Sequence, residues 1–314
     1  MTILLAATGW DASLWRAKLA EIIPSRALAT LDEPHDPAAV RYVLSWRHPP
    51  GALKALPNLK IIFSLGAGVD HIFADPELPD VPIVRVIDPD LRDRMSEWVV
   101  MHALIHLRQL RRYEEQQRNK IWADDDFQPS AHEVSVGVLG LGVLGQDTAL
   151  KLNTLGFRVA GWSATPKSIP GVETFSGADG LDALLARTDM LVALLPLTDA
   201  TRGMLNADLL VALKRDGALG GPVLLNAGRG GLQVEADILA ALDSGLLKGA
   251  SLDVFEQEPL PEASRLWSHP AVYVSPHNAA ISAPDVVIAG IARQIEAFER
   301  GEPLTNGVDR QRGY

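Results

Sequence analysis

VSVGVLGLGVLG, residues 134–145, is the stretch of this chain that decides its fold. Residues 134–139 are apolar and rich in valine, which predicts a buried strand, and residues 146–155 have a helical composition. Between them, a G-x-G-x-x-G permits a tight turn, a close approach of a pyrophosphate to the backbone, and close helix–strand packing. The motif predicts a dinucleotide-binding loop at a helix N-terminus, formed by Gly140, Gly142, Val143, Leu144 and Gly145. The competing interpretation is a glycine-rich turn without a ligand.

The rest of the chain alternates short apolar runs with helical stretches, which predicts an α/β fold with mainly parallel sheets. Strands are expected first at 3–7, 42–46, 61–65 and 83–86, with a helix at 11–22. A second series of strands is expected at 134–139, 158–162, 190–195, 222–227, 249–254 and 272–275, followed by a helix at 284–300. Because this last helix comes after the second series has ended, it is expected to return to the first domain.

The expected architecture is two doubly wound parallel-sheet domains. A Rossmann cofactor domain, residues 95–284, is inserted into a flavodoxin-like substrate domain made of residues 1–94 and 285–314. The segment 94–122 is predicted to be one long helix. Its first half is apolar on nearly every side and is expected to be buried, whereas the charged residues 108–120 are expected to face solvent.

The composition excludes several classes of protein. The net charge of −10 argues against nucleic acid as a partner, because phosphate contacts need a basic face. No apolar run reaches about eighteen residues, so no membrane span is expected. The first ten residues resemble a strand more than a signal peptide, so a cytoplasmic location is expected. The chain has no cysteine, which removes disulfides, thiolate nucleophiles and cysteine-ligated metals, and no metal site is expected.

The turn after the strand 158–162 carries the signal for the kind of nicotinamide cofactor. NAD-binding proteins usually place an acidic residue there, which binds the ribose 2′-hydroxyl. This chain has Ser163, followed by Thr165 and Lys167. A carboxylate would repel a 2′-phosphate, whereas hydroxyls and an ammonium group attract one. NADP(H) is therefore the preferred expectation and NAD(H) the alternative, while a polar loop with a chance lysine would explain the same residues.

The strand 190–195 is also expected to reach the cofactor. It ends in Leu195 and Pro196, and Thr201 follows shortly after. A doubly wound sheet presents its ligand site at the carboxyl ends of its strands, so these three residues are expected to contact the cofactor.

Residues that can support catalysis follow the last three predicted strands. Arg229 comes after the strand 222–227, and Glu258 and His277 follow the next two strands. Each residue could also have a non-catalytic role: a surface ion pair for the arginine, a solubilising loop residue for the glutamate and a helix cap for the histidine. Because the carboxyl ends of parallel strands share one edge of a sheet, the three side chains are expected to converge.

These motifs resemble the D-isomer-specific 2-hydroxyacid dehydrogenase family, and within it the glyoxylate/hydroxypyruvate reductase A branch. The resemblance rests on GLGVLG at 140–145, LLPLTDATRGMLN at 194–206, NAGRGG at 226–231, ALDSGLLKGASLDVFEQEPLP at 241–261, LWSHP at 266–270, SPHNAA at 275–280 and VDRQRGY at 308–314. Residues 44–72, LSWRHPPGALKALPNLKIIFSLGAGVDHI, fit as well, so the resemblance covers essentially the whole chain.

The resemblance implies an oxidoreductase that reduces small 2-oxo acids to 2-hydroxy acids by hydride transfer, with Arg229, Glu258 and His277 as its catalytic set. The guanidinium of Arg229 can hold a carboxylate bidentately and polarise the ketone. Protonated His277 can donate to the carbonyl oxygen as general acid. Glu258 would bind the other ring nitrogen and fix the tautomer. Positive charge near the developing alkoxide is expected to lower the barrier most.

The same resemblance implies the remaining contacts. Beside the nicotinamide it places Asn226, Ala227 and Asp253. Around the substrate it places backbone N–H groups of the loop 65–69, which contains Ala67 and Gly68; a simple strand-ending turn is the alternative for this loop. The indoles of Trp46 and Trp267 could form the walls of the pocket and restrict it to small substrates. Plain core packing is the alternative for both tryptophans. A homodimer through the segment 95–122 is also expected.

Two positions depart from the family pattern. Asn278 follows His277 where the family usually has an apolar residue, and Gly228 precedes Arg229 where alanine or serine is commoner. Either change could loosen the site or alter substrate choice, but neither removes a catalytic group. Two other functions stay open. One is a relative that oxidises another small anion, such as formate or phosphite, and the other is a non-catalytic dinucleotide sensor or corepressor on the same fold.

Overall fold

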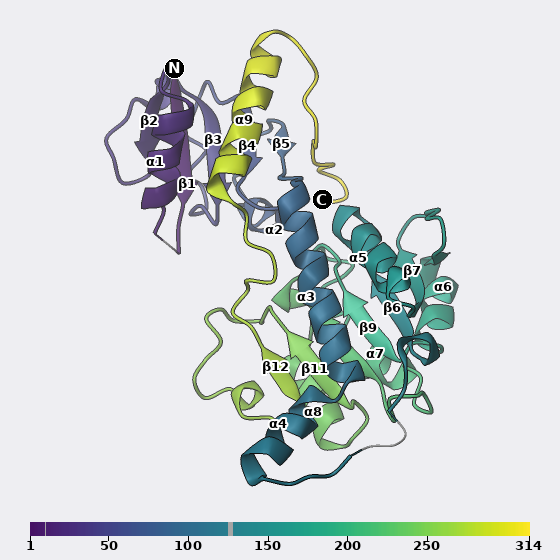
Figure 1. The fold of residues 1–314 in the computed structure, drawn as a ribbon. Coiled ribbons are helices and arrows are strands. Elements are labelled where there is room, and N and C mark those ends of the chain that lie inside the picture. Colours follow the sequence, from purple (N-terminus) through teal and green to yellow (C-terminus); the bar gives the residue numbers. More distant parts are fainter. Residues whose placement is uncertain (10, 125–127) are drawn as a thin grey trace. The chain divides into compact units, whose positions relative to one another are not determined.

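The computed structural model describes residues 1–9, 11–124 and 128–314 and divides into two compact units. The first unit comprises residues 1–91 and 282–314, and the second comprises residues 92–281 (Figure 1). Each unit contains its own parallel sheet, so the predicted α/β class with two doubly wound sheets is confirmed. The assignment of the first unit to substrate and the second to cofactor stays a prediction.

The sheet of the first unit has the strand order β2-β1-β3-β4-β5. Its strands are β1 (Thr2–Ala7), β2 (Ala27–Thr30), β3 (Val40–Trp46), β4 (Ile61–Ser64) and β5 (Ile83–Val84). All neighbouring pairs are parallel. This is the order of flavodoxin-like sheets, which hold ligands at the carboxyl ends of their strands.

Helices cover both faces of this first sheet. α1 (Ser13–Ile22) and α9 (Pro284–Glu299) pack together on one face, where Leu19 and Ile288 are buried among the strand side chains. The short α2 (Asp70–Phe73) contributes Ile72 to the core on the other face. The helix at the end of the chain therefore belongs to the first unit, as the sequence indicated.

The sheet of the second unit has the order β12-β11-β10-β9-β6-β7-β8, which is a dinucleotide-binding sheet with one further strand. Its strands are β6 (Ser135–Leu139), β7 (Arg158–Ser163), β8 (Glu173–Ser176), β9 (Met190–Ala193), β10 (Val223–Asn226), β11 (Gly249–Leu252) and β12 (Val272–Val274). All pairs are again parallel, so the carboxyl ends of the strands meet at one edge.

Helices also cover both faces of the second sheet (Figure 1). They are α3 (Pro89–Leu107), α5 (Val143–Thr154), α6 (Gly177–Leu185), α7 (Ala207–Ala212) and α8 (Glu235–Asp243), and α4 (Leu110–Asn119) follows α3 without contributing to the core. Buried residues of α3 and α5 form the core on one face, and those of α6, α7 and α8 form it on the other. Short 3₁₀ turns lie at Pro37–Ala39, Ala131–Glu133, Gly230–Leu232 and Arg265–Trp267.

The prediction of one helix over 94–122 is wrong. α3 ends at Leu107, and Gln109 has a left-handed backbone (φ +54°) that starts α4 in a new direction. Side chains of α3 such as Val99 are buried, and none in α4 is. The edge strands β2 and β8 were not predicted, because each is only four residues long and partly exposed. No helix in the described part of the chain is both long and apolar enough to cross a membrane.

Candidate active site

The glycine-rich loop joins β6 to α5 and depends on two glycines for its shape. Gly140 has φ +98°, and a Cβ built there would lie 2.6 Å from the carbonyl oxygen of Leu194. A Cβ at Gly145 would collide with the carbonyl oxygen of Gly140. These contacts bring the helix against the strand, and the helix begins at Val143, earlier than the sequence indicated.

Gly142 differs from both, because no protein atom lies within 4 Å of where its Cβ would be. It is the N-cap of α5, and no side chain caps the helix there. The N–H groups of the first turn, including those of Val143 and Leu144, thus lie beside open space at the positive end of the helix dipole. This arrangement fits the phosphates of a dinucleotide, because a pyrophosphate can approach the backbone only where no Cβ intervenes.

The turn after β7 holds the residues expected at a 2′-phosphate. Ser163 is buried, and its hydroxyl donates to the carbonyl oxygen of Thr165 (2.7 Å), which fixes the turn. Thr165 and Lys167 are exposed. Residues 163–168 contain no carboxylate, so nothing in the turn itself would repel a 2′-phosphate.

The loop after β9 is closed by Thr201. Its hydroxyl donates to the carbonyl oxygen of Pro196 (2.7 Å) and accepts from the backbone N–H of Thr198 (2.9 Å). The strand ends at Ala193, and Leu195 is buried. Thr201 therefore shapes this loop at the carboxyl edge of the sheet.

The three strands that precede the catalytic candidates lie side by side in one register. Asn226 of β10 is level with Leu252 of β11, and Leu252 is level with Val274 of β12. The loops that follow them start at the same edge. A Cβ at Gly230 would collide with the carbonyl oxygen of Phe255, so the loop after β10 packs directly on the loop after β11. The structure thus brings Arg229, Glu258 and His277 to one sheet edge, as the sequence predicted.

The loop of Arg229 is held by the fully buried amide of Asn226. The Asn226 side chain donates to the carbonyl oxygen of Arg229 (3.1 Å) and to Gln233 Oε1 (2.8 Å), and accepts from the N–H of Gly228 (3.0 Å). One guanidinium nitrogen of Arg229 donates to the carbonyl oxygen of Gly228 (2.8 Å). Asn226 therefore shapes the arginine loop, a task that its sequence position did not reveal. Ala227 is buried beside it.

His277 and Glu258 form a hydrogen-bonded pair. Nδ1 of His277 lies 3.0 and 2.9 Å from the two carboxylate oxygens of Glu258. The backbone N–H of Phe255 donates to Glu258 Oε1 (3.2 Å), which fixes the carboxylate. Since a carboxylate accepts only, Nδ1 carries the proton and Nε2 is the nitrogen that faces away from the pair.

The buried carboxylate of Asp253 fixes the loop of His277 by hydrogen bonds. Its side chain is 1% exposed and accepts from Ser275 Oγ (2.6 Å), from the N–H of Asn278 (3.0 Å) and from the N–H of Ala279 (3.0 Å). The sequence indicated Asp253 as a cofactor contact but missed Ser275. The sequence signal for Ser275 was its hydroxyl, two residues before His277 and directly after a strand.

The substrate candidates of the first unit lie together. The loop 65–69 follows β4, and a Cβ at Gly66 would lie 2.6 Å from the indole ring of Trp46. That ring also packs on His71, with ring centroids 4.8 Å apart. Within the described residues, the backbone N–H groups of Ala67 and Gly68 make no hydrogen bond. Binding of a substrate carboxylate by these N–H groups stays a prediction.

The remaining candidates lie in the second unit. Trp267 is 52% exposed, and its indole donates to the carbonyl oxygen of Pro261 (3.1 Å), so it is not a core residue. A methyl group at Gly228 would lie 2.9 Å from a Leu232 methyl and 3.0 Å from the carbonyl oxygen of Leu195, so this chain leaves little room for a larger residue.

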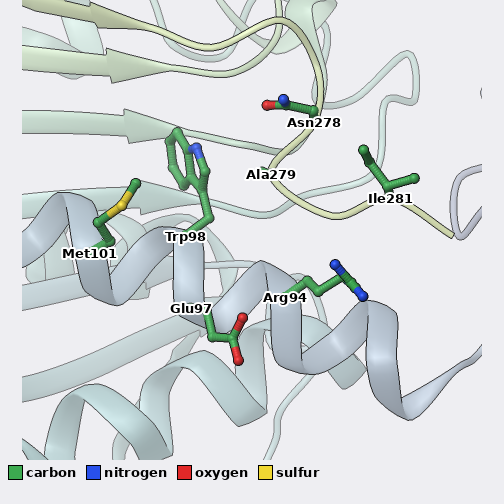
Figure 2. Close-up of a pocket in the computed structure, with 7 residues that line it drawn as sticks. All are labelled: Arg94, Glu97, Trp98, Met101, Asn278, Ala279 and Ile281. Carbon is green, nitrogen blue, oxygen red and sulfur yellow. The ribbon is translucent and has the colours of Figure 1, made fainter. Parts of the chain in front are cut away.

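A pocket of about 240 Å³ lies between α3 and the segment after His277. Figure 2 shows its lining: Arg94, Glu97, Trp98, Met101, Asn278, Ala279 and Ile281. Asn278, which departs from the family pattern, therefore lines this pocket. Among the residues described, no group of three or more histidine or acidic side chains could hold a metal ion.

Comparison of the chain with known proteins identifies relatives that all belong to one family of dehydrogenases. Residues 100–279 match a family model described as D-isomer specific 2-hydroxyacid dehydrogenase, NAD binding domain. A glyoxylate/hydroxypyruvate reductase A of Escherichia fergusonii is 41% identical over 321 aligned positions that cover 100% of both chains. An NADPH-dependent glyoxylate/hydroxypyruvate reductase of Sinorhizobium meliloti, solved with NADP and sulfate, is 49% identical, with a TM-score of 0.95 and coverage of 100% of this chain and 99% of that one. A probable 2-hydroxyacid dehydrogenase of Rhizobium etli, solved with NADP, HEPES and L(+)-tartaric acid, is 47% identical, with a TM-score of 0.94 and the same coverage.

Proposed function

Because the chain belongs to the D-isomer-specific 2-hydroxyacid dehydrogenase family, we propose that it reduces small 2-oxo acids of the glyoxylate and hydroxypyruvate type, with NADPH preferred over NADH. The chain is an NAD(P)-dependent dehydrogenase. The observation that most supports the reduction of 2-oxo acids is the His277–Glu258 pair, which lies at the same sheet edge as Arg229. The S. meliloti relative is named for the same substrates and was solved with NADP.

Arg229 binds the substrate in this proposal. Its planar guanidinium pairs with the 2-oxo acid, and its positive charge stabilises the negative charge that develops on the ketone oxygen. Asn226 supports this role by fixing the backbone of the arginine loop. The backbone N–H groups of Ala67 and Gly68 supply further donors for the substrate carboxylate, and the indoles of Trp46 and Trp267 limit the size of the acid.

His277 is the general acid. Because Nδ1 is engaged by Glu258, the proton given to the ketone oxygen leaves from Nε2. Glu258 stabilises the protonated ring before the step and keeps its tautomer afterwards. When bound, NADPH would supply the hydride for the new C–H bond at the ketone carbon.

The open Gly142 site and the turn after β7 support NADP(H) as that cofactor. The uncapped first turn of α5 would hold the pyrophosphate, together with Leu195, Pro196 and Thr201 at the end of β9. Lys167 and the hydroxyl of Thr165 would hold the 2′-phosphate, because both are exposed and no carboxylate lies in their turn. The nicotinamide would lie beside Asn226, Ala227 and Asp253. The buried side chains of Asn226 and Asp253 would shape the loops around it.

A homodimer completes the proposal. The segment 95–122 carries apolar side chains that the chain leaves exposed: Met101 at 48%, Ile121 at 55% and Trp122 at 98%. Burial of such side chains against a second copy would remove apolar area from water. Sedimentation velocity decides this point: a dimer that Trp122→Asp weakens supports the proposal, and a monomer at all concentrations contradicts it.

Steady-state oxidation of NADPH and of NADH tests the proposed function. Glyoxylate, hydroxypyruvate, pyruvate and a bulkier 2-oxo acid serve as substrates, with formate and phosphite assayed in the oxidative direction. Turnover of the smallest acids with NADPH favoured is expected, and Lys167→Ala should remove most of that preference while the exposed Lys60→Ala should not. Tight NADPH binding without any turnover would identify a dinucleotide sensor instead.

A further inference from the structure

We propose that Ser275 and Trp98 are positioning residues for the general acid, because they form a hydrogen-bonded chain that ends on the carboxylate holding the His277 loop. The indole Nε1–H of Trp98 donates to Ser275 Oγ (3.1 Å), and Ser275 Oγ–H donates to Asp253 Oδ1 (2.6 Å). The inference rests on the proposed function, in which His277 gives the proton.

The direction of this chain of hydrogen bonds is fixed by the chemistry of its ends. An indole N–H can only donate and an ionised carboxylate can only accept. The hydroxyl of Ser275 has a single proton, so accepting from Trp98 leaves that proton for Asp253. Trp98 therefore sets the orientation of the serine hydroxyl, and the serine stabilises a carboxylate that is 1% exposed and needs donors.

The carboxylate of Asp253 in turn fixes the backbone of the loop that carries His277. Its two oxygens accept from the N–H groups of Asn278 and Ala279, and the carbonyl oxygen of Asp253 accepts from the N–H of His277 (2.7 Å). His277 has a left-handed backbone (φ +53°), which is strained for a residue with a side chain. Such a conformation persists only where neighbouring groups stabilise it. Here the N–H groups of residues 277–279 donate three hydrogen bonds to Asp253 and stabilise it.

Trp98 is itself buried and packed against a second ring. It is 8% exposed, and its ring packs on that of His102 in a tilted arrangement, with ring centroids 4.1 Å apart and an angle of 40° between the planes. In Figure 2 its indole points from α3 toward the segment that carries Asn278 and Ala279. A buried donor on α3 thus reaches the hydroxyl that orients the loop, and loss of either group should let His277 move away from its reactive geometry.

Three variants test the proposal. Ser275→Ala removes the hydroxyl, Ser275→Thr retains it, and Trp98→Phe removes only the N–H and keeps an aromatic ring. We expect Ser275→Ala and Trp98→Phe to lower kcat about tenfold while the Kd for NADPH stays within about twofold, since a displaced catalytic group slows the chemical step. Ser275→Thr should recover most of the rate. Trp15→Phe, a buried tryptophan in the first unit, is the matched control and should leave kcat unchanged.

Hydrogen–deuterium exchange of residues 277–279 gives a readout that does not depend on activity. Ser275→Ala should speed exchange of these amides about tenfold by weakening the aspartate that holds them, and Ser275→Thr should not. Unchanged exchange and unchanged kcat in Ser275→Ala would overturn the inference, as would equal losses in the alanine and threonine variants. A parent chain that turns over no 2-oxo acid would overturn the proposed function alone, because the exchange data still decide whether Ser275 holds the loop.

Discussion

Nδ1 of His277 lies within 3.0 Å of both carboxylate oxygens of Glu258, so the glutamate engages one ring nitrogen and Nε2 stays outside the pair. The pair spans two loops, one after β11 and one after β12, and each loop is fixed by its own backbone hydrogen bonds. The orientation of His277, the proposed general acid, is therefore set within the second unit.

Glu258→Gln should lower kcat for reduction by about 10- to 100-fold, because a neutral amide cannot stabilise a protonated imidazole. NADPH binding should stay unchanged, since the glycine-rich loop is untouched. Stopped-flow hydride transfer and a fluorescence titration measure the two quantities. Glu262→Gln, an exposed glutamate of the same loop, is the control. A Glu258→Gln variant as fast as the parent would remove the glutamate from the mechanism.

Arg229→Lys should reduce kcat/KM for glyoxylate by about 100-fold, although the charge is conserved, because lysine lacks the planar fork that pairs with a carboxylate. Full kinetics of both proteins measure the loss, and Arg215→Lys, at an exposed position, serves as the control. An unchanged kcat/KM would contradict bidentate binding by Arg229.

Gly142→Ala and Gly145→Ala should separate cofactor binding from stability. At Gly142 the backbone (φ −77°) suits alanine and the space is empty, so the free energy of unfolding should change by less than about 0.5 kcal/mol. The Kd for NADPH should nevertheless rise at least about tenfold, because the methyl group blocks the pyrophosphate. Gly145→Ala should destabilise by about 2 kcal/mol or more through its collision with Gly140. Unweakened NADPH binding by Gly142→Ala would mean that the phosphates bind elsewhere.

His102 should make the protein less stable in acid. Burial lowers its pKa from 6.5 to about 4, because the charged ring loses its hydration. Above pH 6.5 the ring is neutral in both states and contributes nothing. As the pH falls toward 4, only the unfolded chain takes up the proton, and about 3 kcal/mol of stability is lost. Urea unfolding at about pH 7.5 and pH 4.5 should show a smaller acid loss for His102→Phe than for the parent. His132→Phe, at an exposed site, should lose as much as the parent.

The fold and the catalytic candidates could be predicted because their signals are local. Apolar runs with glycine turns mark the strands, and the order of the strands places Arg229, Glu258 and His277 at one edge. The break at Gln109 was not predictable, because a left-handed residue at the end of a helix leaves no mark in an otherwise helical composition.

The supporting network could not be predicted for a different reason. Asn226 was expected to face the cofactor, yet its amide is engaged by Gly228, Arg229 and Gln233. Ser275 meets Trp98, which lies 177 positions away in the sequence. Such contacts depend on how α3 packs on the sheet, and no spacing in the sequence encodes that packing.

Single-turnover reduction of glyoxylate by the enzyme–NADPH complex, with His277→Asn as the comparison, decides whether His277 is the general acid. We expect rapid oxidation of NADPH by the parent, and oxidation at least about 100-fold slower in a variant that binds NADPH equally well. Equal rates in the two proteins, or NADPH that is bound by the parent but never oxidised, would contradict it.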